Sequence, residues 1–498
     1  MLSMPRWGLA AALMTAAALC AAAPAPAQVV GQPVTPIPPD PVADPPEFVG
    51  NPATADSVDA PSVPRHPFMA PNGLSNLHDD AYQTDTYTWS GPLGEDTTTD
   101  SALFFRECAS ITVDSAGRLV TVCVGLDHPV LAMLDPQTLE PLATFDLPPR
   151  QPGAGSNPFT DFSGGGYFYL DRHDRIVAPT TTRHIYVIRE TDGPGFELRR
   201  DLDLSGALAS DDKIISALPD WHGRIWFAST HGVVGWVGRN AARVHKRELG
   251  EPIGNSFMVD EQGSVYMVTD GALYRLEAHA GEVRTVWRAG YANTGEVKPG
   301  QTQAGSGTTP TMIGGGRWVA ITDNADPMNA VVYQRARNPD GKRVICKEPL
   351  FEEGASATDQ SLIGAGRSVV AENNYGYTLA EVESGGDAIE PGLQRVDVDR
   401  DGRGCDTAWT SDERAPSVVP KLSLEAGLVY TYTFPTDQDW YLTAIDFRTG
   451  ETEYSRLAGT GLGFNNNYAP VTLTPDGTAY VGVLGGVTMF QDAAATGR

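Results

Sequence analysis

The sequence predicts an all-β protein, a β-propeller in which repeated four-stranded sheets form one ring. A turn-plus-strand phrase, such as Asp-Ser-Ala-Gly117 followed by Arg-Leu-Val-Thr-Val, recurs at a mean spacing of about 51 residues. The chain holds 53 Gly and 38 Pro, which suits many turns. Between residues 73 and 490 no long apolar run has helical spacing, and Val, Tyr, Trp and Thr fill the short runs after each turn. A period near fifty residues made of short strands is typical of propeller blades.

The number of blades follows from the number of copies of this phrase. Eight copies end at Gly117, Asp174, Gly223, Gly263, Gly316, Gly366, Gly427 and Gly477. Eight blades are therefore expected. Seven is the alternative, because the copies at Gly316, Gly366 and Gly427 are looser than the others.

The last repeat lacks one strand of a full blade. Its strands are expected at residues 469–473, 478–483 and 487–490, after which no fourth strand follows. The run Tyr82 to Ser90 is expected to supply the missing outer strand. Pairing of N- and C-terminal strands in one blade would close the ring and remove its exposed edges.

The N-terminus has the pattern of an export signal. Arg6 precedes an apolar, Ala-rich stretch, and Ala25-Pro26-Ala27 fits a cleavage site. The sequence thus predicts a signal peptide over residues 1–27, a Pro-rich disordered leader over 28–72, and a propeller domain over 73–498. An exported protein, periplasmic or extracellular, is expected, with no membrane span.

The chain is acidic, with a formal net charge of −26 at pH 7. Such a surface repels nucleic acid and anionic lipid, so neither is an expected partner. Keeping an exported protein soluble is the simpler role of this charge. The expected partner is therefore a small polar ligand or another protein. The sequence does not indicate the oligomeric state.

Four cysteines remain after the predicted cleavage, which suits an oxidising compartment. Cys108 and Cys123 flank the first turn and would face each other across a hairpin, close enough for a disulfide. Cys346 and Cys405 form the second expected pair. Free buried thiols are the alternative for each pair.

A second motif follows the third strand of several repeats. Its fullest copy is Ala444-Ile-Asp446-Phe-Arg-Thr449-Gly450-Glu-Thr-Glu-Tyr454. It resembles the A-x-D-x-x-T-G-x-x-x-W docking motif of quinoprotein-type (PQQ-like) propellers, with Tyr454 in the place of the usual Trp. The Asp and Thr side chains would stabilise the hairpin turn, and the aromatic ring would wedge between adjacent blades. Weaker copies contain Asp135 with Thr138, Gly281 with Trp287, and Gly404 with Trp409.

The resemblance covers most of residues 100–490 and implies a propeller fold. For a dehydrogenase of that family it would also imply adjacent cysteines, a catalytic Asp and a Glu/Asn calcium set. This chain has no Cys-Cys pair and no C-x-x-C-H haem site, and the other residues find no match. A quinone cofactor is therefore not expected, calcium stays open, and no cofactor is assigned.

The repeat also predicts which loops surround the mouth of the central channel. These are the loops that lead into each inner strand and those that join second to third strands. Amides, carboxylates and aromatic groups there would suit a polyol, a sugar or a polar cofactor. The alternative is that turns favour Asn and Asp for backbone reasons. The candidate ligand-binding residues are Asp127, His128, Arg183, His184, His231, Asp270, Asp323, Asn324, Asp359, Asn373, Asn374, Asp412, Arg414, Asn465, Asn466 and Asn467.

Two subsets of side chains are candidates for metal binding. His128, His184 and His231 would hold a metal or act as acid and base if they converged at the mouth, and would otherwise be isolated surface histidines. Asp397, Asp399 and Asp401 resemble the start of a calcium loop, but the twelfth position is Ala408 rather than Glu. A solvated turn between a third and a fourth strand is the alternative.

No catalytic signature identifies a reaction. The sequence holds no G-x-S-x-G elbow, no H-E-x-x-H and no Walker loop. The leading hypothesis is an exported propeller with a binding or scaffold role at its channel mouth. The alternative is an enzyme, either a divergent quinoprotein-like oxidoreductase or a hydrolase or lyase acting on a carbohydrate-like substrate.

Overall fold

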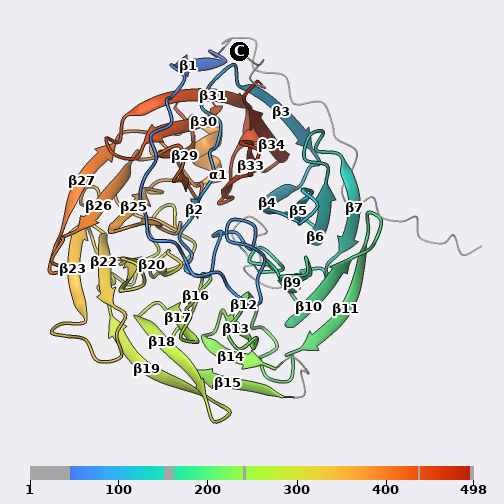
Figure 1. Ribbon diagram of the computed structural model, residues 1–498, viewed down its shortest axis with the longest axis vertical. Helices are drawn as coiled ribbons and strands as arrows, with labels where there is room; N and C mark the ends of the chain where they lie inside the picture. Colours follow the sequence, from blue (N-terminus) through green and yellow to red (C-terminus); the bar gives the residue numbers. More distant parts are fainter. Residues whose placement is uncertain (1–44, 151–160, 162, 239–242, 436–437, 494–498) are drawn as a thin grey trace, which may run out of the picture.

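Eight β-sheets radiate around a central axis in the computed structural model of the protein (Figure 1). Seven sheets have four strands and the eighth has six. The structure describes residues 45–150, 161, 163–238, 243–435 and 438–493, so the predicted signal peptide lies outside the described residues. The expected all-β, eight-bladed ring is confirmed, and the seven-bladed alternative is not.

Each blade runs from an inner strand at the axis to an outer strand at the rim. Blades one to four, numbered along the chain, contain β4 (Glu107–Val113), β5 (Leu119–Val124), β6 (Val130–Leu134), β7 (Pro141–Asp146); β8 (Tyr169–Leu170), β9 (Ile176–Pro179), β10 (His184–Glu190), β11 (Phe196–Asp203); β12 (Ile214–Pro219), β13 (Ile225–Ser229), β14 (Val233–Val237), β15 (Val244–Glu248); and β16 (Met258–Val259), β17 (Ser264–Val268), β18 (Ala272–His279), β19 (Glu282–Gly290).

The remaining four blades follow the same order, and each is again antiparallel within its four blade strands. They contain β20 (Thr311–Ile313), β21 (Trp318–Thr322), β22 (Asn329–Gln334), β23 (Val344–Pro349); β24 (Ile363–Ala365), β25 (Ser368–Glu372), β26 (Leu393–Val398), β27 (Cys405–Ser411); β28 (Lys421–Ser423), β29 (Leu428–Thr433), β30 (Asp439–Asp446), β31 (Thr452–Thr460); and β32 (Val471–Leu473), β33 (Ala479–Val483), β34 (Gly486–Gln491) with β3 (Thr98–Leu103). Helical elements of the described residues are α1 (Leu379–Glu383) and the 3-10 turn η1 (Leu462–Phe464).

All eight recurring turn positions have the same backbone conformation. The φ angles of the eight residues that end the repeated phrase are positive, from 52° at Asp174 to 87° at Gly477. Each lies in or beside the turn between an inner strand and the second strand. Glycine adopts this left-handed region without a steric penalty, and Asp tolerates it better than most residues. The period of the sequence is therefore the period of one backbone turn.

An aspartate caps several of these turns. In blade three, Oδ1 of Asp220 accepts hydrogen bonds from the backbone N–H groups of His222 and Arg224 at 2.9 and 3.1 Å. Its Oδ2 accepts from Nε of Arg224 and Nε1 of Trp226 at 2.6 and 2.9 Å. Asp114, Asp171 and Asp260 accept from their own turns in the same way.

The ring is closed by strands from the two ends of the chain. β3 pairs antiparallel with β34, from Thr98 opposite Gln491 to Leu103 opposite Gly486. Closure by N- and C-terminal strands is thus confirmed, but the expected strand over Tyr82 to Ser90 was wrong. Within that run only β2 (Thr86–Tyr87) is a strand, and it lies parallel to the inner strand β28. Buried contacts at the axis hold this run at the hub, so it cannot reach the rim.

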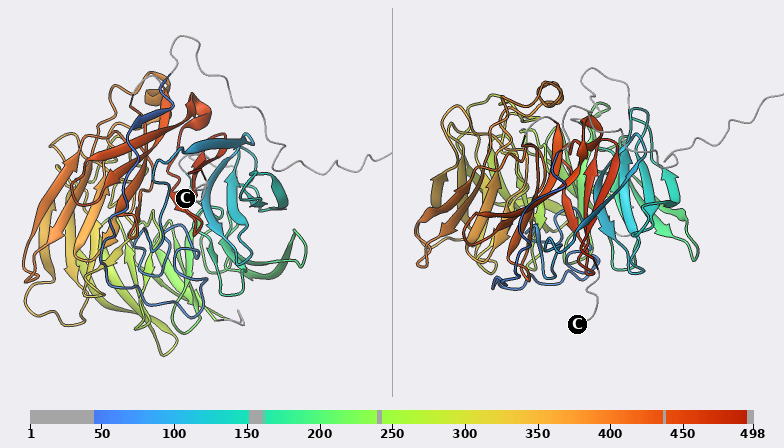
Figure 2. Two further views of the ribbon diagram at one scale, coloured as in Figure 1. Left: turned by 45° about the horizontal axis from the view of Figure 1, so that its top comes forward. Right: turned by 90° about the horizontal axis from the view of Figure 1, so that it is seen from above.

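The segment before β3, residues 45–97, is called here the N-terminal segment. Its strand β1 (Phe48–Gly50) extends blade seven by pairing antiparallel with β31. Farther along, the carbonyls of four residues accept hydrogen bonds from the inner strands of blades four to seven; they belong to Ala81, Tyr82, Thr84 and Asp85. Figure 2 shows the segment across one face of the ring, with α1 on the opposite face. The expectation of a disordered leader is therefore wrong from residue 45 on, because this part is paired with the propeller.

The docking motif works largely as expected. The carboxylate of Asp446 accepts from the N–H groups of Arg448 and Thr449 at 2.7 and 2.8 Å, and Asp135 makes the equivalent bonds. Trp409 of blade six donates from Nε1 to the carbonyl of Phe447 in blade seven at 2.9 Å. Tyr454 differs, because its ring stacks on Phe48 and its hydroxyl donates to Pro92, both in the N-terminal segment.

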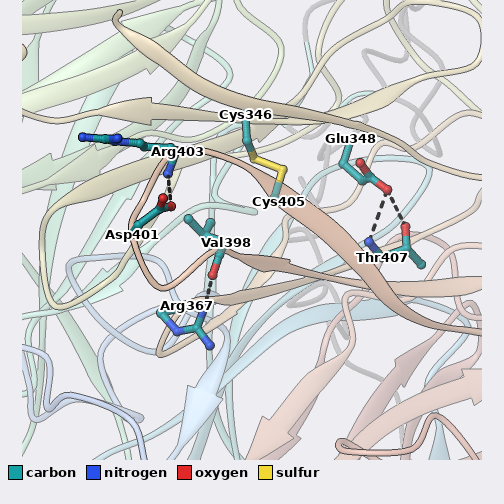
Figure 3. The surroundings of a disulfide bond; sticks show 8 residues. All are labelled: Cys346, Glu348, Arg367, Val398, Asp401, Arg403, Cys405 and Thr407. Carbon is teal, nitrogen blue, oxygen red and sulfur yellow. Dashed lines mark hydrogen bonds between the residues drawn. A yellow bond between two sulfur atoms is a disulfide. The ribbon is translucent and has the colours of Figure 1, made fainter. Parts of the chain in front are cut away.

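Both expected disulfides are confirmed. Cys108 and Cys123 lie opposite each other in β4 and β5, and their bond stays within blade one. Cys346 and Cys405 join β23 of blade five to β27 of blade six (Figure 3). Beside the second bond, Glu348 accepts from the N–H and hydroxyl of Thr407 at 3.2 and 2.9 Å. A covalent bond and two hydrogen bonds thus connect neighbouring outer strands.

Within the described part of the chain, no helix has the length and apolar character needed to cross a membrane.

Candidate ligand site in the central channel

A cavity occupies the hub of the ring. Its volume is about 670 Å³ including space open to solvent, and its lining comes from seven of the eight blades. Leu77 and His78 of the N-terminal segment also line it. The N-terminal segment crosses one face of the ring (Figure 2). The part of the lining that Leu77 and His78 contribute is called here the floor. The loops that lead into the inner strands form the walls.

Glu107 begins β4 and lines the cavity beside the loop that enters blade eight. Its Oε2 accepts a hydrogen bond from Nδ2 of Asn467 at 3.2 Å. Burial raises the pKa of Glu107 to about 8, although the bond from Asn467 and the charge of Arg150 act in the opposite direction. Glu107 is therefore mostly a neutral acid at pH 7 and can donate a proton or a hydrogen bond.

Asp359 lines the cavity from the loop that enters blade six. Its Oδ2 accepts from the backbone N–H and hydroxyl of Thr302 at 2.6 and 2.7 Å. Its Oδ1 is buried and has no hydrogen-bond partner among the described residues. Burial raises the pKa of Asp359 to about 7, so both protonation states are present near neutral pH.

A buried guanidinium lies in the wall between blades one and two. Nη2 of Arg150 donates to the carbonyls of Asp161 and Ser163 at 2.8 and 3.4 Å. Nε lies 3.9 Å from Oδ2 of Asp161, which also accepts from Nζ of Lys213 at 2.6 Å. Burial lowers the pKa of Arg150, but a guanidinium stays protonated in proteins. Nε and Nη1 form no hydrogen bond with any described residue.

Tyr167 and Asn255 form a polar pair in the lining. The hydroxyl of Tyr167 donates to Oδ1 of Asn255 at 3.1 Å. Nδ2 of Asn255 is buried without a partner in the described chain. The pair can therefore offer one amide donor to a bound molecule.

His78 stands on the cavity floor and is held through one ring nitrogen. Nδ1 lies 3.0 Å from Oδ1 of Asp85 and 3.0 Å from Oγ of Ser361, and Ser361 donates to Oδ2 of Asp85 at 2.6 Å. Nδ1 must then donate to the carboxylate, which leaves Nε2 as an acceptor. Burial lowers the pKa of His78, so the ring is neutral. Nε2 is buried and unpaired within the described structure.

The structure places two of the predicted mouth residues, Asp359 and Asn467, in the cavity lining. The amides at 324, 373, 374, 465 and 466 hydrogen-bond to neighbouring backbone or buried side chains. Asp323 accepts from Asn329, Asp127 pairs with Arg106, and Arg414 and Arg183 donate to backbone carbonyls. The carbonyl of Asp270 accepts from Asn293, the N–H of His231 donates to Asp212, and Asp412 is exposed.

The three mouth histidines are not brought together. His128 pairs with Asp127 and Asp146 of its own blade, at 2.9 and 3.7 Å. His184 pairs with Asp201 and Asp203 of its own blade, at 2.5 and 3.4 Å. The rings of His128 and His184 thus contact carboxylates of their own blades rather than another imidazole.

The carboxylates of the calcium-loop candidate also point to separate partners. Asp397 pairs with Arg395 at 2.8 Å, and Asp401 accepts from the backbone N–H of Arg403 at 3.0 Å (Figure 3). Asp399 begins the turn that joins β26 to β27. Among the described residues, no group of three or more His, Cys, Asp or Glu side chains could hold a metal ion.

Sequence reasoning missed several lining residues, among them His78, Glu107, Arg150, Asp161 and Tyr167. Glu107 lies within a strand rather than a loop, and Arg150 and Asp161 lie in an unusually long connection between blades. His78 belongs to a segment that was not assigned to the hub. The run His-Asp-Asp-Ala-Tyr-Gln-Thr-Asp85, with three carboxylates between small and aromatic residues, was the available signal.

Comparison with known proteins agrees on the fold. No protein family model matches the sequence. An uncharacterized protein of Archaeoglobus fulgidus is 29% identical over 318 residues, which cover 57% of this chain and 62% of that protein. The chain thus matches about three fifths of the length of this curated relative.

Two solved structures share the architecture. One is BamB from Moraxella catarrhalis, with a TM-score of 0.50 and 10% identity over 81% of this chain and 99% of that one. The other is a europium-containing methanol dehydrogenase, with a TM-score of 0.50 and 10% identity over 82% of this chain and 89% of that one. The chain has the fold of these propellers. At this identity the likeness concerns the fold alone, which the resemblance to quinoprotein-type propellers had implied.

Proposed function

We propose that this protein binds a small polar molecule in the cavity at the hub of its propeller. The observation that carries this proposal is a set of unpaired polar atoms from different parts of the cavity lining. They are Oδ1 of Asp359, Nδ2 of Asn255, Nε2 of His78, and Nε and Nη1 of Arg150. A buried polar group without a partner costs about 1–3 kcal/mol, and native proteins keep few of them.

The chemistry of these atoms favours a hydroxylated ligand. Asp359 and His78 offer acceptors, and Asn255 and Arg150 offer donors. A hydroxyl group can satisfy either kind, since it both donates and accepts. Leu77, Val124 and Val419 add apolar surface to the lining, which suits the carbon chain of a sugar or polyol.

We also infer that the protein works outside the cytoplasm, in the periplasm or beyond. The two disulfides support this inference, because such bonds form and persist in oxidising compartments. The acidic net charge of −26 suits a soluble exported protein.

Calorimetric titration of the full chain with a panel of sugars, polyols and sugar acids tests the binding role. Asp359→Asn is expected to weaken binding of any active panel member about tenfold, the equivalent of ~1.4 kcal/mol. Asp127→Asn is the matched control, because Asp127 was also predicted at the mouth but does not line the cavity. The proposal fails if no member binds, or if Asp359→Asn and Asp127→Asn bind as tightly as the unchanged protein.

The enzymatic alternative has one observation in its favour. Glu107 and Asp359, with pKa values raised to about 8 and about 7, line the same cavity, and such carboxyls can serve as general acids near neutral pH. A hydrolase or lyase would release product from a bound carbohydrate. Glu107→Gln would then stop product formation, followed by NMR, while binding persists. Unchanged ligand spectra over a day with bound ligand would contradict this alternative.

A further inference from the structure

Arg150 shares its nearest carboxylate with a second cation. The carboxylate of Asp161 is shared between Lys213 at 2.6 Å and Arg150 at 3.9 Å, so one anion faces two cations. The nearby Glu107 is mostly protonated at pH 7. Asp212, next to Lys213, keeps its negative charge and accepts hydrogen bonds from the N–H groups of Lys213 and His231 and the hydroxyl of Thr230. It is not among the carboxylates that act on Arg150.

The guanidinium of Arg150 is also poorly satisfied by its neutral partners. Only Nη2 reaches acceptors, both backbone carbonyls, while Nε and Nη1 meet none in the described chain. The side chain is 8% exposed, so water reaches it poorly. A buried charge of this kind is stabilised best by an opposite charge with hydrogen-bond acceptors, and a carboxylate supplies both.

The other polar groups of the lining suit the hydroxyl groups of a ligand better than a second charged group. His78 is neutral, and its Nε2 is an acceptor. In the floor, the positive charge of Lys421 is balanced by the negative charge of Asp85. Asp359 offers a free Oδ1, and Asn255 offers a free Nδ2. These groups come from the N-terminal segment and from blades six and four, on other parts of the lining than Arg150.

We propose that the ligand of this site is a small hydroxylated carboxylate, with its carboxylate on Arg150 and its hydroxyls on Asp359, His78 and Asn255. This inference rests on the proposed binding function and specifies its ligand class. A monoanion is favoured over a phosphate ester, because Arg150 is the one Lys or Arg in the described cavity lining and Glu107 and Asp161 lie close to it. A dianion would meet these acids without a second cation in the lining, because Lys213 pairs with Asp161 and does not line the cavity.

The test compares D-gluconate with D-glucitol, which have the same hydroxylated carbon chain and differ at one end, a carboxylate against a CH2OH group. Titration of the full chain at pH 7 is expected to show gluconate binding at least about tenfold tighter than glucitol. Glucitol 6-phosphate is the phosphate ester in this comparison, and it is expected to bind no tighter than glucitol. Arg150→Gln should remove the preference for gluconate and leave the affinity for glucitol within about twofold.

Arg414→Gln is the matched control, since Arg414 donates to a backbone carbonyl outside the cavity, and it should keep the preference. Should Arg150→Gln unfold, Arg150→Lys retains the charge and should retain a preference for gluconate. Equal binding of gluconate and glucitol by the unchanged protein overturns the ligand class and leaves the proposed function standing. Tighter binding of the phosphate also overturns the class. Binding of none of the three probes or other panel members overturns the proposed function itself.

Discussion

Nζ of Lys421, on the inner strand of blade seven, lies 2.5 Å from Oδ1 of Asp85 in the N-terminal segment, and both side chains are fully buried. Asp79 lies 3.2 Å from the same ammonium group. Burial alone would lower the pKa of Lys421, but Asp79 and Asp85 more than offset it and raise that pKa. This ion pair fixes the floor of the cavity, because Asp85 in turn orients His78.

Replacing Lys421 with Met is expected to destabilise the protein by about 3–5 kcal/mol, because it leaves Asp85 buried without its counter-ion. Hydrogen exchange should also quicken over residues 66–90, which lose their anchor. Chemical unfolding and exchange mass spectrometry measure the two effects. Lys342→Met, at an exposed position, is the control and should change neither. Adding Asp85→Asn to Lys421→Met should recover part of the loss; full stability of the single variant would contradict this account.

Removal of each disulfide is expected to destabilise a different part of the ring. In the chain-entropy account, a separation of 15 residues is worth roughly 3 kcal/mol and one of 59 residues roughly 4 kcal/mol. Cys346→Ala with Cys405→Ala should increase hydrogen exchange in β23 and β27, at the contact between blades five and six. Cys108→Ala with Cys123→Ala should increase it within blade one. Identical exchange maps for the two double variants would rule out this distinction.

Glu107 is expected to make the folded protein less stable as pH rises. Its folded pKa is raised to about 8, so between its ordinary pKa and pH 8 the folded state holds a proton that the unfolded state has released. The free energy of unfolding therefore falls through this range and is lowest above pH 8. Glu107→Gln removes this contribution. The melting temperature of this variant, relative to that of the unchanged protein, should therefore rise from pH 5 to pH 9. A constant difference across that range would refute the buried neutral acid.

The aspartate caps should rank by burial. Asp220 is itself fully buried, and Asp220→Ala leaves two backbone N–H groups and Nε1 of Trp226 without their acceptor, for a loss of about 3 kcal/mol. Asp446→Ala removes two backbone bonds from a turn that water reaches, for about 1 kcal/mol. Urea unfolding of both variants measures the order, and a reversed order would show that burial does not decide the strength of the cap.

The sequence predicted the ring well because its signals are local. A glycine with positive φ at Gly263 or Gly427 and a capping aspartate at Asp220 or Asp114 act within five residues of the chain. Such turns fix where a hairpin begins without help from the rest of the fold. Eight of them at nearly equal spacing are enough to count blades.

The site was harder to predict because its residues depend on contacts between distant parts of the chain. Asn465 and Asn466 have the polarity of ligand groups but use it to bind Tyr377 and backbone carbonyls. Arg150 and His78 reach the cavity only through a long connection and through the N-terminal segment. Nothing local in a Pro-rich stretch indicates that residues after it will line the hub.

The pairing of β3 with β34 has a consequence for synthesis. Ser101 and Thr488, which are bonded across this pair, stand 387 residues apart. During synthesis, seven blades are therefore complete while β3 is still an unpaired edge strand that can pair with neighbouring chains. A chain that stopped before β34 would leave the circle open, although every residue that lines its central cavity had already been synthesised.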